Sequence, residues 1–364
     1  ASEQERFARQ NQTVTDKWVH LGKYLCSFWF CGDFLTGATM LVLLCWGCAL
    51  CVDGTLTVGG LLAAISYLTM QVRPVRGMGR VLSEMSKTGV SMQRLLEIMA
   101  APVEQDAPGA DEPPMDGDIV FDHVSFAYPN SPELLHDVSF TIPAGTTLGI
   151  LGGTGSSKST LVQLIPRLYD VTEGSVKVGG VDVRNYDLEV LRNNVAVVLQ
   201  KNVLFSGTIK DNLRWGNADA TDADMLEACK LAQADEFIQQ FPDKYDTWIE
   251  QGGANVSGGQ KQRLCIARAL LKKPKVLILD DSTSAVDTRT DALIRQGFRE
   301  FIPETTKIII AQRVASVQDA DRIVVMDGGR ISDIGTHDEL MARNEIYREI
   351  YTTQNKAGEQ NGEE

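Results

Sequence analysis

The pattern of hydrophobic positions begins with two long apolar runs. The first, Tyr24 to Val52, is almost uniformly apolar and long enough to cross a bilayer. The second, Val58 to Val72, follows a short connector without Lys or Arg, whereas basic residues precede the first run and follow the second. This asymmetry predicts a transmembrane hairpin with spans at about residues 25–52 and 58–77 and with both ends cytoplasmic. The unbroken length argues against a hairpin buried in a soluble protein.

Two charged residues lie within or beside the predicted spans. Asp33 stands 20 residues before Asp53, and Arg73 stands 20 residues after it, so in antiparallel helices both would lie near the cytoplasmic boundary. We favour interfacial placement over the alternative, an ion pair that lines a substrate path. The stretch before Tyr24 is polar and compatible with a helix, and we expect no cleavable signal peptide. Two spans cannot enclose a pathway alone, so we expect further spans or a partner that supplies them.

Beyond Pro74, apolar residues from Val81 to Met99 recur at helical spacing, which predicts a helix that runs out of the membrane. We assign residues 1–99 to this first part. Residues 100–118 carry four prolines, six acidic residues and no basic one. That composition is typical of a linker.

Residues 119–354 alternate between strand and helix patterns, which predicts an α/β sheet with ligand at the carboxyl ends of its strands. Residues 202–270 are mostly helical in pattern and predict an inserted helical subdomain. A polar tail, residues 355–364, is expected to be disordered. The predicted strands are Ile119–Tyr128, Val138–Ile142, Val176–Val178, Val195–Leu199, Val276–Leu279, Lys307–Ile310 and Ile323–Met326, besides the apolar run Leu148–Leu151.

Net charge limits the class of partner, and the cysteine pattern limits the kinds of site that the chain can contain. A formal net charge of −13 disfavours nucleic acid, whose phosphates need a basic surface. Cys48 and Cys51 form a C-x-x-C, but no histidine or second pair accompanies them, so we interpret them as helix-packing residues rather than a redox or metal site. Cys229 and Cys265 are interpreted as buried thiols in a reducing compartment.

The strongest chemical signal lies at Thr147–Leu161, where an apolar strand pattern runs into a Gly/Ser-rich loop, Lys158-Ser159 and a helix pattern. This is the P-loop arrangement, in which backbone N–H groups cradle phosphates, the lysine reaches the outer phosphates and the Ser159 hydroxyl contacts Mg²⁺. Ser157 replaces the second glycine of the pattern and could fit if its φ were negative. The predicted nucleotide contacts are Gly152, Gly153, Thr154, Gly155, Ser156, Ser157, Lys158, Ser159 and Thr160.

A second glycine motif, Ser257-Gly258-Gly259-Gln260, precedes an apolar helix pattern. Alone it would be a helix cap followed by a turn. Together with the P-loop it resembles the signature of ATP-binding cassette (ABC) proteins, and the resemblance covers residues 119–354. It implies an α/β P-loop NTPase fold, an ABC cassette with an inserted helical subdomain, preceded here by an α-helical transmembrane hairpin.

The resemblance also implies residue roles and the cofactors ATP and Mg²⁺. In the family two cassettes enclose two ATP molecules, and each signature completes the partner's site. The implied roles at the nucleotide are adenine stacking for Tyr128, Mg²⁺ sensing for Gln200 and Mg²⁺ binding through water for Asp280. The loop Ser284–Asp287, and Asp287 in particular, is implied to communicate across the dimer.

Two catalytic positions depart from the family pattern. Asp281 stands where the family has a glutamate general base, and its side chain is one methylene shorter. Gln312 stands where the switch histidine belongs; it can donate a hydrogen bond to the γ-phosphate but cannot become a cation. Two departures beside an intact signature resemble the degenerate-site subunit of a heterodimeric exporter.

The whole chain resembles the last two membrane helices and the cassette of a type IV half-exporter of the multidrug or lipid-exporter kind, and we interpret it as an N-terminally truncated piece, with a natural split as the alternative. We expect a multi-pass protein of the cell membrane with its cassette in the cytoplasm. Its expected partners are a second half-transporter, membrane lipid and an exported substrate of unknown class. The alternatives are a slowly hydrolysing homodimer and a regulatory ATP-binding protein without transport.

Overall fold

The computed structural model describes residues 2–101, 103–104, 106, 109–110, 112–281 and 286–360. They form two compact units, which divide between Val103 and Glu104. The linker was predicted at 100–118, but the second unit already begins inside it. The two units are described separately below.

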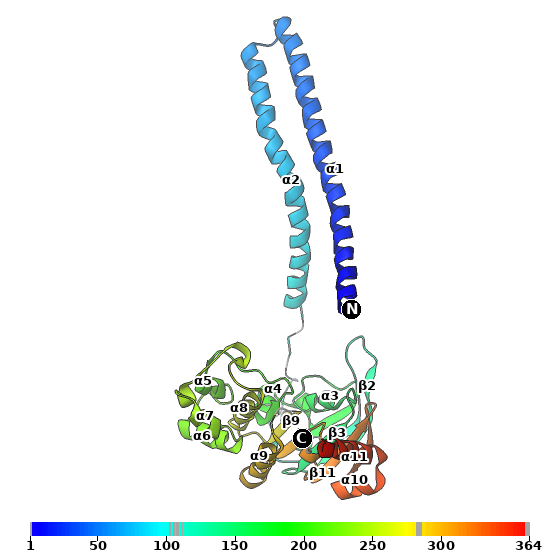
Figure 1. Ribbon diagram of the computed structural model, residues 1–364, viewed down its shortest axis with the longest axis vertical. Coiled ribbons are helices and arrows are strands. Elements are labelled where there is room, and N and C mark those ends of the chain that lie inside the picture. The colour runs from blue at the N-terminus through cyan, green and yellow to red at the C-terminus, as the bar shows by residue number, and fades with distance from the viewer. Residues whose placement is uncertain are drawn as a thin grey trace. The chain divides into compact units, whose positions relative to one another are not determined.

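The first unit is a pair of antiparallel helices, α1 (Ser2–Val52) and α2 (Val58–Met99) (Figure 1). They pack closely near the connector, because a Cβ on Gly47 would lie only 2.3 Å from the Leu61 side chain. Thr57 caps α2 by accepting a hydrogen bond from Gly60 N–H. Helix α2 runs through Pro74 instead of restarting after it, although a proline removes one backbone hydrogen bond from a helix.

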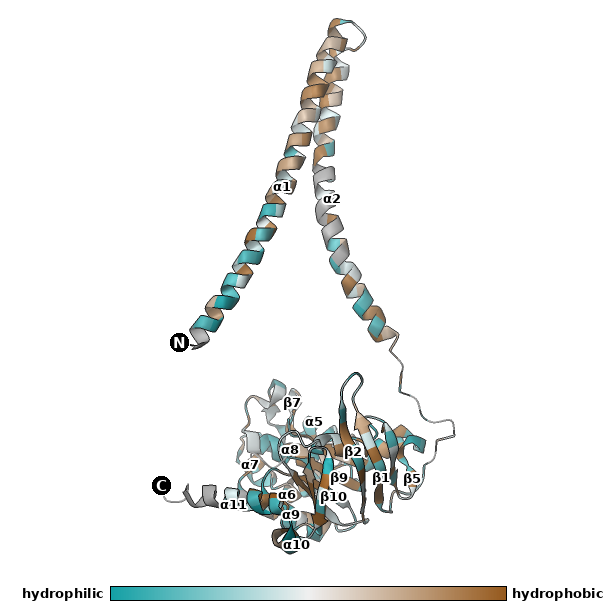
Figure 2. Ribbon diagram, turned by 90° about the vertical axis from the view of Figure 1, so that its right-hand side faces the viewer, coloured by the Kyte–Doolittle hydropathy of each residue, from teal (hydrophilic) through white to brown (hydrophobic). Residues whose placement is uncertain are grey.

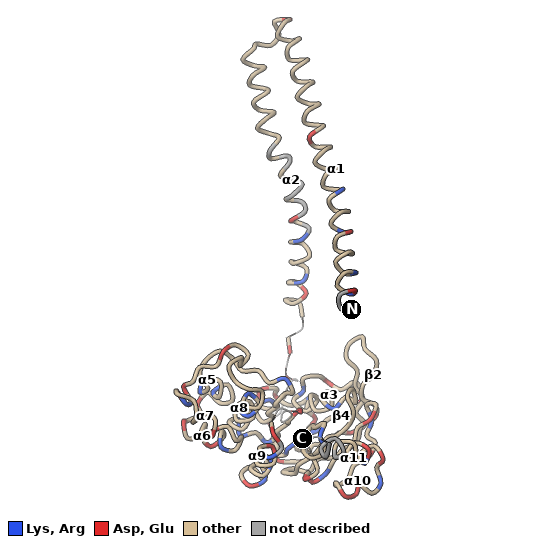
Figure 3. Tube along the Cα trace, viewed as in Figure 1, with Lys and Arg blue, Asp and Glu red and all other residues tan. Residues whose placement is uncertain are grey.

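The hairpin is apolar near its connector and polar near its open end (Figure 2). Between Asp33 and the connector α1 carries no charged residue (Figure 3), and large side chains such as Trp46 are exposed. Among the described residues one helix, Glu5–Val52, is long and apolar enough to cross a membrane; the apolar stretch of α2, Val58–Val72, is shorter. The second predicted span, at 58–77, therefore stays a prediction.

The second unit is built on two larger sheets. The antiparallel sheet has the order β2-β1-β4-β5, and the mainly parallel sheet has the order β12-β11-β3-β10-β9-β6. A core of residues such as Ile119, Leu148 and Leu161 fills the space where they pack. The strands are β1 (Ile119–Ala127), β2 (Glu133–Ile142), β3 (Thr147–Gly152), β4 (Glu173–Val178), β5 (Val181–Asp182), β6 (Val195–Val198), β9 (Val276–Asp280), β10 (Thr306–Ile310), β11 (Arg322–Asp327) and β12 (Arg330–Gly335).

Helices cover the parallel sheet, and α5 to α8 gather as a separate group at one side of this unit (Figure 1). That group contains a small ladder between β7 (Gly207–Thr208) and β8 (Trp248–Ile249). The helices are α3 (Lys158–Gln163), α4 (Leu188–Asn194), α5 (Ile209–Arg214), α6 (Asp222–Leu231), α7 (Asp235–Gln240), α8 (Gly258–Leu270), α9 (Thr288–Phe301), α10 (His337–Arg343) and α11 (Glu345–Gln360), with 3₁₀ turns η1 (Val183–Asn185), η2 (Lys244–Asp246), η3 (Gln251–Gly253) and η4 (Val314–Ser316).

Each strand predicted from the sequence coincides with one of these strands, and the described residues add β12 and the two-residue strands β5, β7 and β8. The prediction of a disordered tail at 355–364 is wrong for its first part, because α11 continues through Gln360; residues 361–364 lie outside the described residues. Buried Tyr347 and the apolar contacts of Ile350 hold the start of this helix on the core. The polar composition of the tail gave no sign that the preceding part of this helix packs on the core.

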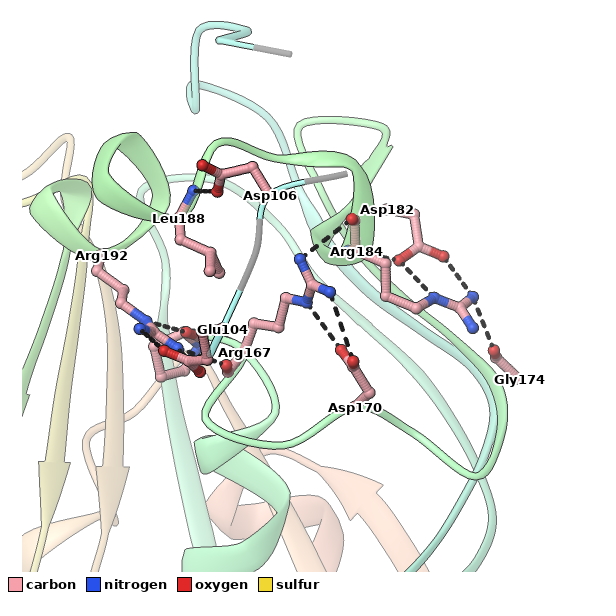
Figure 4. Close-up of polar contacts among 10 residues, drawn as sticks. Glu104, Asp106, Arg167, Asp170, Gly174, Asp182, Arg184, Leu188 and Arg192 are labelled. Carbon is pink, nitrogen blue, oxygen red and sulfur yellow. Dashed lines mark hydrogen bonds and ion pairs between the residues drawn. The ribbon is translucent and has the colours of Figure 1, made fainter. Parts of the chain in front are cut away.

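The acidic segment after Val103 is attached to the second unit (Figure 4). Both Glu104 carboxylate oxygens accept hydrogen bonds from the Arg192 guanidinium at 2.7 Å, and this contact holds the pKa of Glu104 below its usual value. Arg192 also donates to the backbone oxygens of Pro166 and Arg167, just beyond α3. Asp106 accepts a hydrogen bond from Leu188 N–H at the start of α4. Arg192 therefore joins the segment to the end of the P-loop helix.

Arg192→Met should lower the free energy of unfolding of this unit by about 1–2 kcal/mol, because the Pro166 and Arg167 carbonyls lose a charged donor. Glu104→Gln should cost less than about 0.5 kcal/mol, since its carboxylate is largely exposed and screened. Urea titration of both variants measures the difference. Equal losses would assign the contribution of Arg192 to the ion pair instead of the carbonyls.

Candidate nucleotide-binding site

The parallel sheet brings four sequence motifs to one edge. In the ladder Ile310 lies opposite both Ile150 and Asp280, and Val198 lies opposite Leu279. The chain therefore leaves β3, β10, β9 and β6 at nearly the same level, as parallel pairing requires. The P-loop follows β3, Gln312 follows β10, Asp281 follows β9, and Gln200 follows β6.

The P-loop connects β3 to α3 and is shaped by close backbone approach. A Cβ on Gly152 would lie 2.3 Å from the Met326 backbone oxygen, so only glycine fits. Lys158 folds back over the loop, where its Nζ donates to the oxygens of Gly152 and Gly153 at 2.8 Å and to Ser156 Oγ at 3.2 Å. Burial lowers the pKa of the Lys158 amine, and the nearby carboxylates of Asp280 and Asp281 oppose that shift. The lysine is therefore ordered at the loop that it is predicted to serve.

Ser157 does not have the negative φ that would let a serine fit at this position without strain. Its φ is +67°, in the left-handed region, where a side chain costs about 1–2 kcal/mol. A negative φ would have made serine a neutral replacement for glycine. The structure instead gives this residue the conformation that favours glycine.

Asp280, Ser159 and Gln200 are the residues that would supply oxygen atoms to the predicted Mg²⁺. Asp280 is buried, and its burial raises the pKa of its carboxyl, whereas a hydrogen bond from Ser159 opposes that shift. Gln200 donates its amide N–H to Asp281, and its amide oxygen is the atom that a metal would use. Hydroxyl, carboxylate and amide oxygens are the hard donors that Mg²⁺ prefers, so the residues fit the ion.

Asp281 lies at the centre of a polar cluster formed by the two motif glutamines. Its Oδ2 accepts a hydrogen bond from Gln200 Nε2 at 3.2 Å and from Gln312 Nε2 at 3.0 Å. Burial raises the pKa of the Asp281 carboxyl, and the hydrogen bond from Gln200 and the charge of Arg313 oppose this. Asp281 has a φ of +46°, a conformation that aspartate tolerates better than most residues. Its carboxylate is thus turned toward the two glutamines in this structure.

Tyr128 follows β1 within an aromatic cluster. Its ring lies edge-on to Phe126 and Tyr169 with centroid distances of 4.9 and 5.0 Å. Its hydroxyl lies 3.4 Å from Thr160 Oγ1, which links it to the P-loop helix. The predicted base-stacking residue therefore neighbours the predicted phosphate site. Tyr169, the third ring of this cluster, was not among the residues predicted from the sequence.

The signature residues start α8 in the helical subdomain. Ser257 and Gln260 form a reciprocal capping box, with Ser257 N–H donating to Gln260 Oε1 at 2.9 Å and Gln260 N–H donating to Ser257 Oγ at 3.2 Å. Ser257 and Gly258 are exposed. The capping role considered from the sequence is therefore present, and Ser257 and Gly258 also face solvent, where a second cassette could reach them.

The remaining predicted residues lie outside this cluster. Asp287 caps α9 by accepting a hydrogen bond from Thr290 N–H, while Ser284 and Ala285 of the same motif lie outside the described residues. The Arg73 side chain also lies outside them, so its pairing with Asp33 stays a hypothesis. Cys48 and Cys51 lie on α1 as free thiols, and the described residues contain no His, Cys, Asp and Glu cluster of three or more that could hold a metal.

Comparisons with known proteins agree with this geometry. Residues 135–284 match the family model described as ABC transporter. A solved structure described as a bacterial Atm1-family ABC exporter with ATP bound superimposes with a TM-score of 0.70 and 34% sequence identity, covering 89% of this chain and 58% of that chain. The second unit is therefore an ABC cassette with a P-loop NTPase fold, as predicted.

Two curated relatives come from Bacillus subtilis (strain 168). The "Putative multidrug export ATP-binding/permease protein YgaD" is 39% identical over 357 residues, 97% of this chain and 61% of the relative. The "Probable multidrug resistance ABC transporter ATP-binding/permease protein YheI" is 40% identical over 325 residues, 88% of this chain and 55% of the relative. The chain thus spans somewhat more than half the length of these relatives. It carries an ABC transporter domain, and both relatives are named as ATP-binding/permease proteins.

Ser157→Gly should raise the free energy of unfolding of the cassette by about 0.5–1 kcal/mol, because relief of the left-handed conformation exceeds the added entropy of the unfolded chain. Urea titration of the whole chain measures this. Ser156→Gly is the matched control: it loses the hydroxyl bond to the Gly153 oxygen and should destabilise by about 1 kcal/mol. A loss of stability for Ser157→Gly would contradict the strain assigned to this residue.

Proposed function

We propose that this chain is the ATP-binding and membrane-spanning subunit of an ABC exporter, which couples ATP binding and hydrolysis to the export of a substrate across the cell membrane. The cassette fold, the apolar α1 and the names of the relatives support this proposal. The hairpin of α1 and α2 would contribute two spans to a multi-pass transporter, in contact with lipid. Neither Asp33 nor Arg73 defines a substrate class.

We propose that the ATP site formed by the P-loop of this chain, its own site, holds nucleotide with little hydrolysis. The observation that carries this is the cluster around Asp281, in which one carboxylate oxygen already accepts hydrogen bonds from Gln200 and Gln312. A general base must lie within hydrogen-bond reach of its water, and an aspartate extends one methylene less than the glutamate of the family pattern. Gln312 can hold a γ-phosphate oxygen by an amide N–H but cannot exchange a proton.

The other site residues would bind and orient ATP. Tyr128 would stack on adenine, the P-loop amides and Lys158 would hold the phosphates, and Ser159, Gln200 and Asp280 would hold Mg²⁺. When bound, Mg²⁺ offsets phosphate charge at the site. The signature Ser257–Gln260, whose Ser257 and Gly258 are exposed, would complete the hydrolytic site of a second half-transporter, so a heterodimer is favoured over a homodimer.

Two substitutions, one in the signature and one at the chain's own ATP site, distinguish the heterodimer from its alternatives. In the assembled transporter, Ser257→Arg should lower ATP turnover at least about tenfold, because it blocks the partner's site. Asp281→Asn should lower turnover less than about twofold, because the own site contributes little. Steady-state phosphate release measures both variants.

The matched control is Thr221→Ala, which removes the same kind of capping box from α6 without touching the signature, and its turnover should stay unchanged. Equal and large losses for Ser257→Arg and Asp281→Asn would favour the homodimer. Normal turnover in Ser257→Arg would contradict a role of the signature in hydrolysis and favour a regulatory ATP-binding protein.

A gain of function tests the impaired site directly. The double variant Asp281→Glu, Gln312→His restores both family residues and should raise hydrolysis at the own site by about tenfold or more, within the roughly 10²–10⁴-fold contribution of a general base, when turnover is measured in the Ser257→Arg background that blocks the partner's site. The surface double variant Asp338→Glu, Gln296→His makes the same chemical changes on α10 and α9 and should leave turnover unchanged. Unaltered turnover in the restored variant would sink the proposal of an impaired site.

A further inference from the structure

The backbone of the loop that carries Gln312 is bound by a side chain of the C-terminal helix α11. This switch loop, residues 311–317, leaves β10 after Ala311 N–H donates to the Ile150 oxygen. Gln354 of α11 then contacts it with both ends of its amide. Its Nε2 donates to the Gln312 backbone oxygen at 2.7 Å, and its Oε1 accepts from Val314 N–H at 2.9 Å.

This pair of hydrogen bonds brackets the turn between Gln312 and Val314. A side-chain amide that bonds one backbone oxygen and one backbone N–H acts as a neighbouring strand would, so it fixes both groups at once. The Gln312 side chain projects from the same bracketed segment and donates to Asp281 Oδ2 at 3.0 Å. A continuous set of contacts therefore runs from α11 through the Gln312 backbone to the carboxylate at the nucleotide site.

Helix α11 is anchored well enough to serve as a fixed support. Tyr347 is fully buried, and its hydroxyl lies 2.7 Å from His337 Nδ1. Ile350 and Tyr351 pack against the core. Gln354 follows these residues by seven, four and three positions, which places it on the same face of the helix. Its amide is thus held by the anchored face.

We propose that Gln354 is a positioning residue that sets the Gln312 backbone so that the Gln312 amide can meet the γ-phosphate and distinguish ATP from ADP. This rests on the γ-phosphate contact proposed above for Gln312. ADP lacks that phosphate, so loss of the bracket weakens ATP binding and leaves ADP binding unchanged. The effect does not depend on how fast the site hydrolyses ATP.

The test uses the assembled transporter and equilibrium binding of Mg²⁺-ADP and of a non-hydrolysable Mg²⁺-ATP analogue at the own site. Gln354→Met keeps the volume and removes both hydrogen bonds, and should reduce the selectivity for the ATP analogue roughly three- to tenfold, the ratio that one or two ordinary hydrogen bonds represent. Gln354→Glu keeps the acceptor for Val314 N–H and loses the donor to the Gln312 oxygen. It should give a clear loss too, and it decides the test if the methionine variant does not fold.

The control Gln296→Met removes a comparable amide on α9, which bonds only Glu300 among the described hydrogen bonds, and should leave selectivity unchanged. In a Gln312→Ala background, Gln354→Met should change selectivity less than about twofold, because the positioned side chain is gone. That non-additivity would not arise from a general loss of stability.

Two negative results are distinguishable. If Gln312→Ala lowers selectivity but Gln354→Met and Gln354→Glu do not, or if they weaken ADP and the ATP analogue equally, Gln354 is only a structural contact and the inference is overturned. If Gln312→Ala itself leaves selectivity unchanged, the γ-phosphate role of Gln312 fails, and the positioning role of Gln354 fails with it.

Discussion

Parallel pairing of β9, β10 and β3 is the constraint on which the nucleotide site depends. The register that sets Ile310 opposite both Asp280 and Ile150 places three chain ends within one cluster, although they are far apart in sequence. Every residue of β9 and β10 is buried, so a slip in register would move the polar residues that follow these strands into the core. The apolar packing of the sheet and the geometry of the site are therefore the same property of the fold.

Around that edge, polar side chains satisfy one another closely. Lys158 bonds its own loop, Asp280 bonds Ser159, and Asp281 bonds two glutamines. Such a network is stable without ligand, because each buried charge has partners. Binding of a triphosphate would have to exchange these contacts for contacts with phosphate, so the affinity of the site would be a difference between two well-bonded states.

The sheet strands were predictable because buried parallel strands are short apolar runs between turn signals. Strand β12 was missed because it is an edge strand with a partly exposed, mixed pattern. The site residues could be proposed from motifs and family resemblance, but their contacts could not. The φ of Ser157, the bonding of Asp281 and the bracket by Gln354 depend on tertiary packing. Composition misled in two places, where acidic Glu104 and polar α11 resembled linker and tail yet are held by Arg192 and by buried Tyr347.

The left-handed backbone at residue 157 restricts which amino acids natural variants of this chain can carry there. Sterics favour glycine, asparagine and aspartate at such a φ. An added carboxylate would be repelled by the phosphates of the proposed ATP, which disfavours aspartate. Branched residues such as valine or threonine fail the steric condition. We therefore expect glycine or asparagine at position 157 in natural variants. Serine, the residue present here, is tolerated at a steric cost.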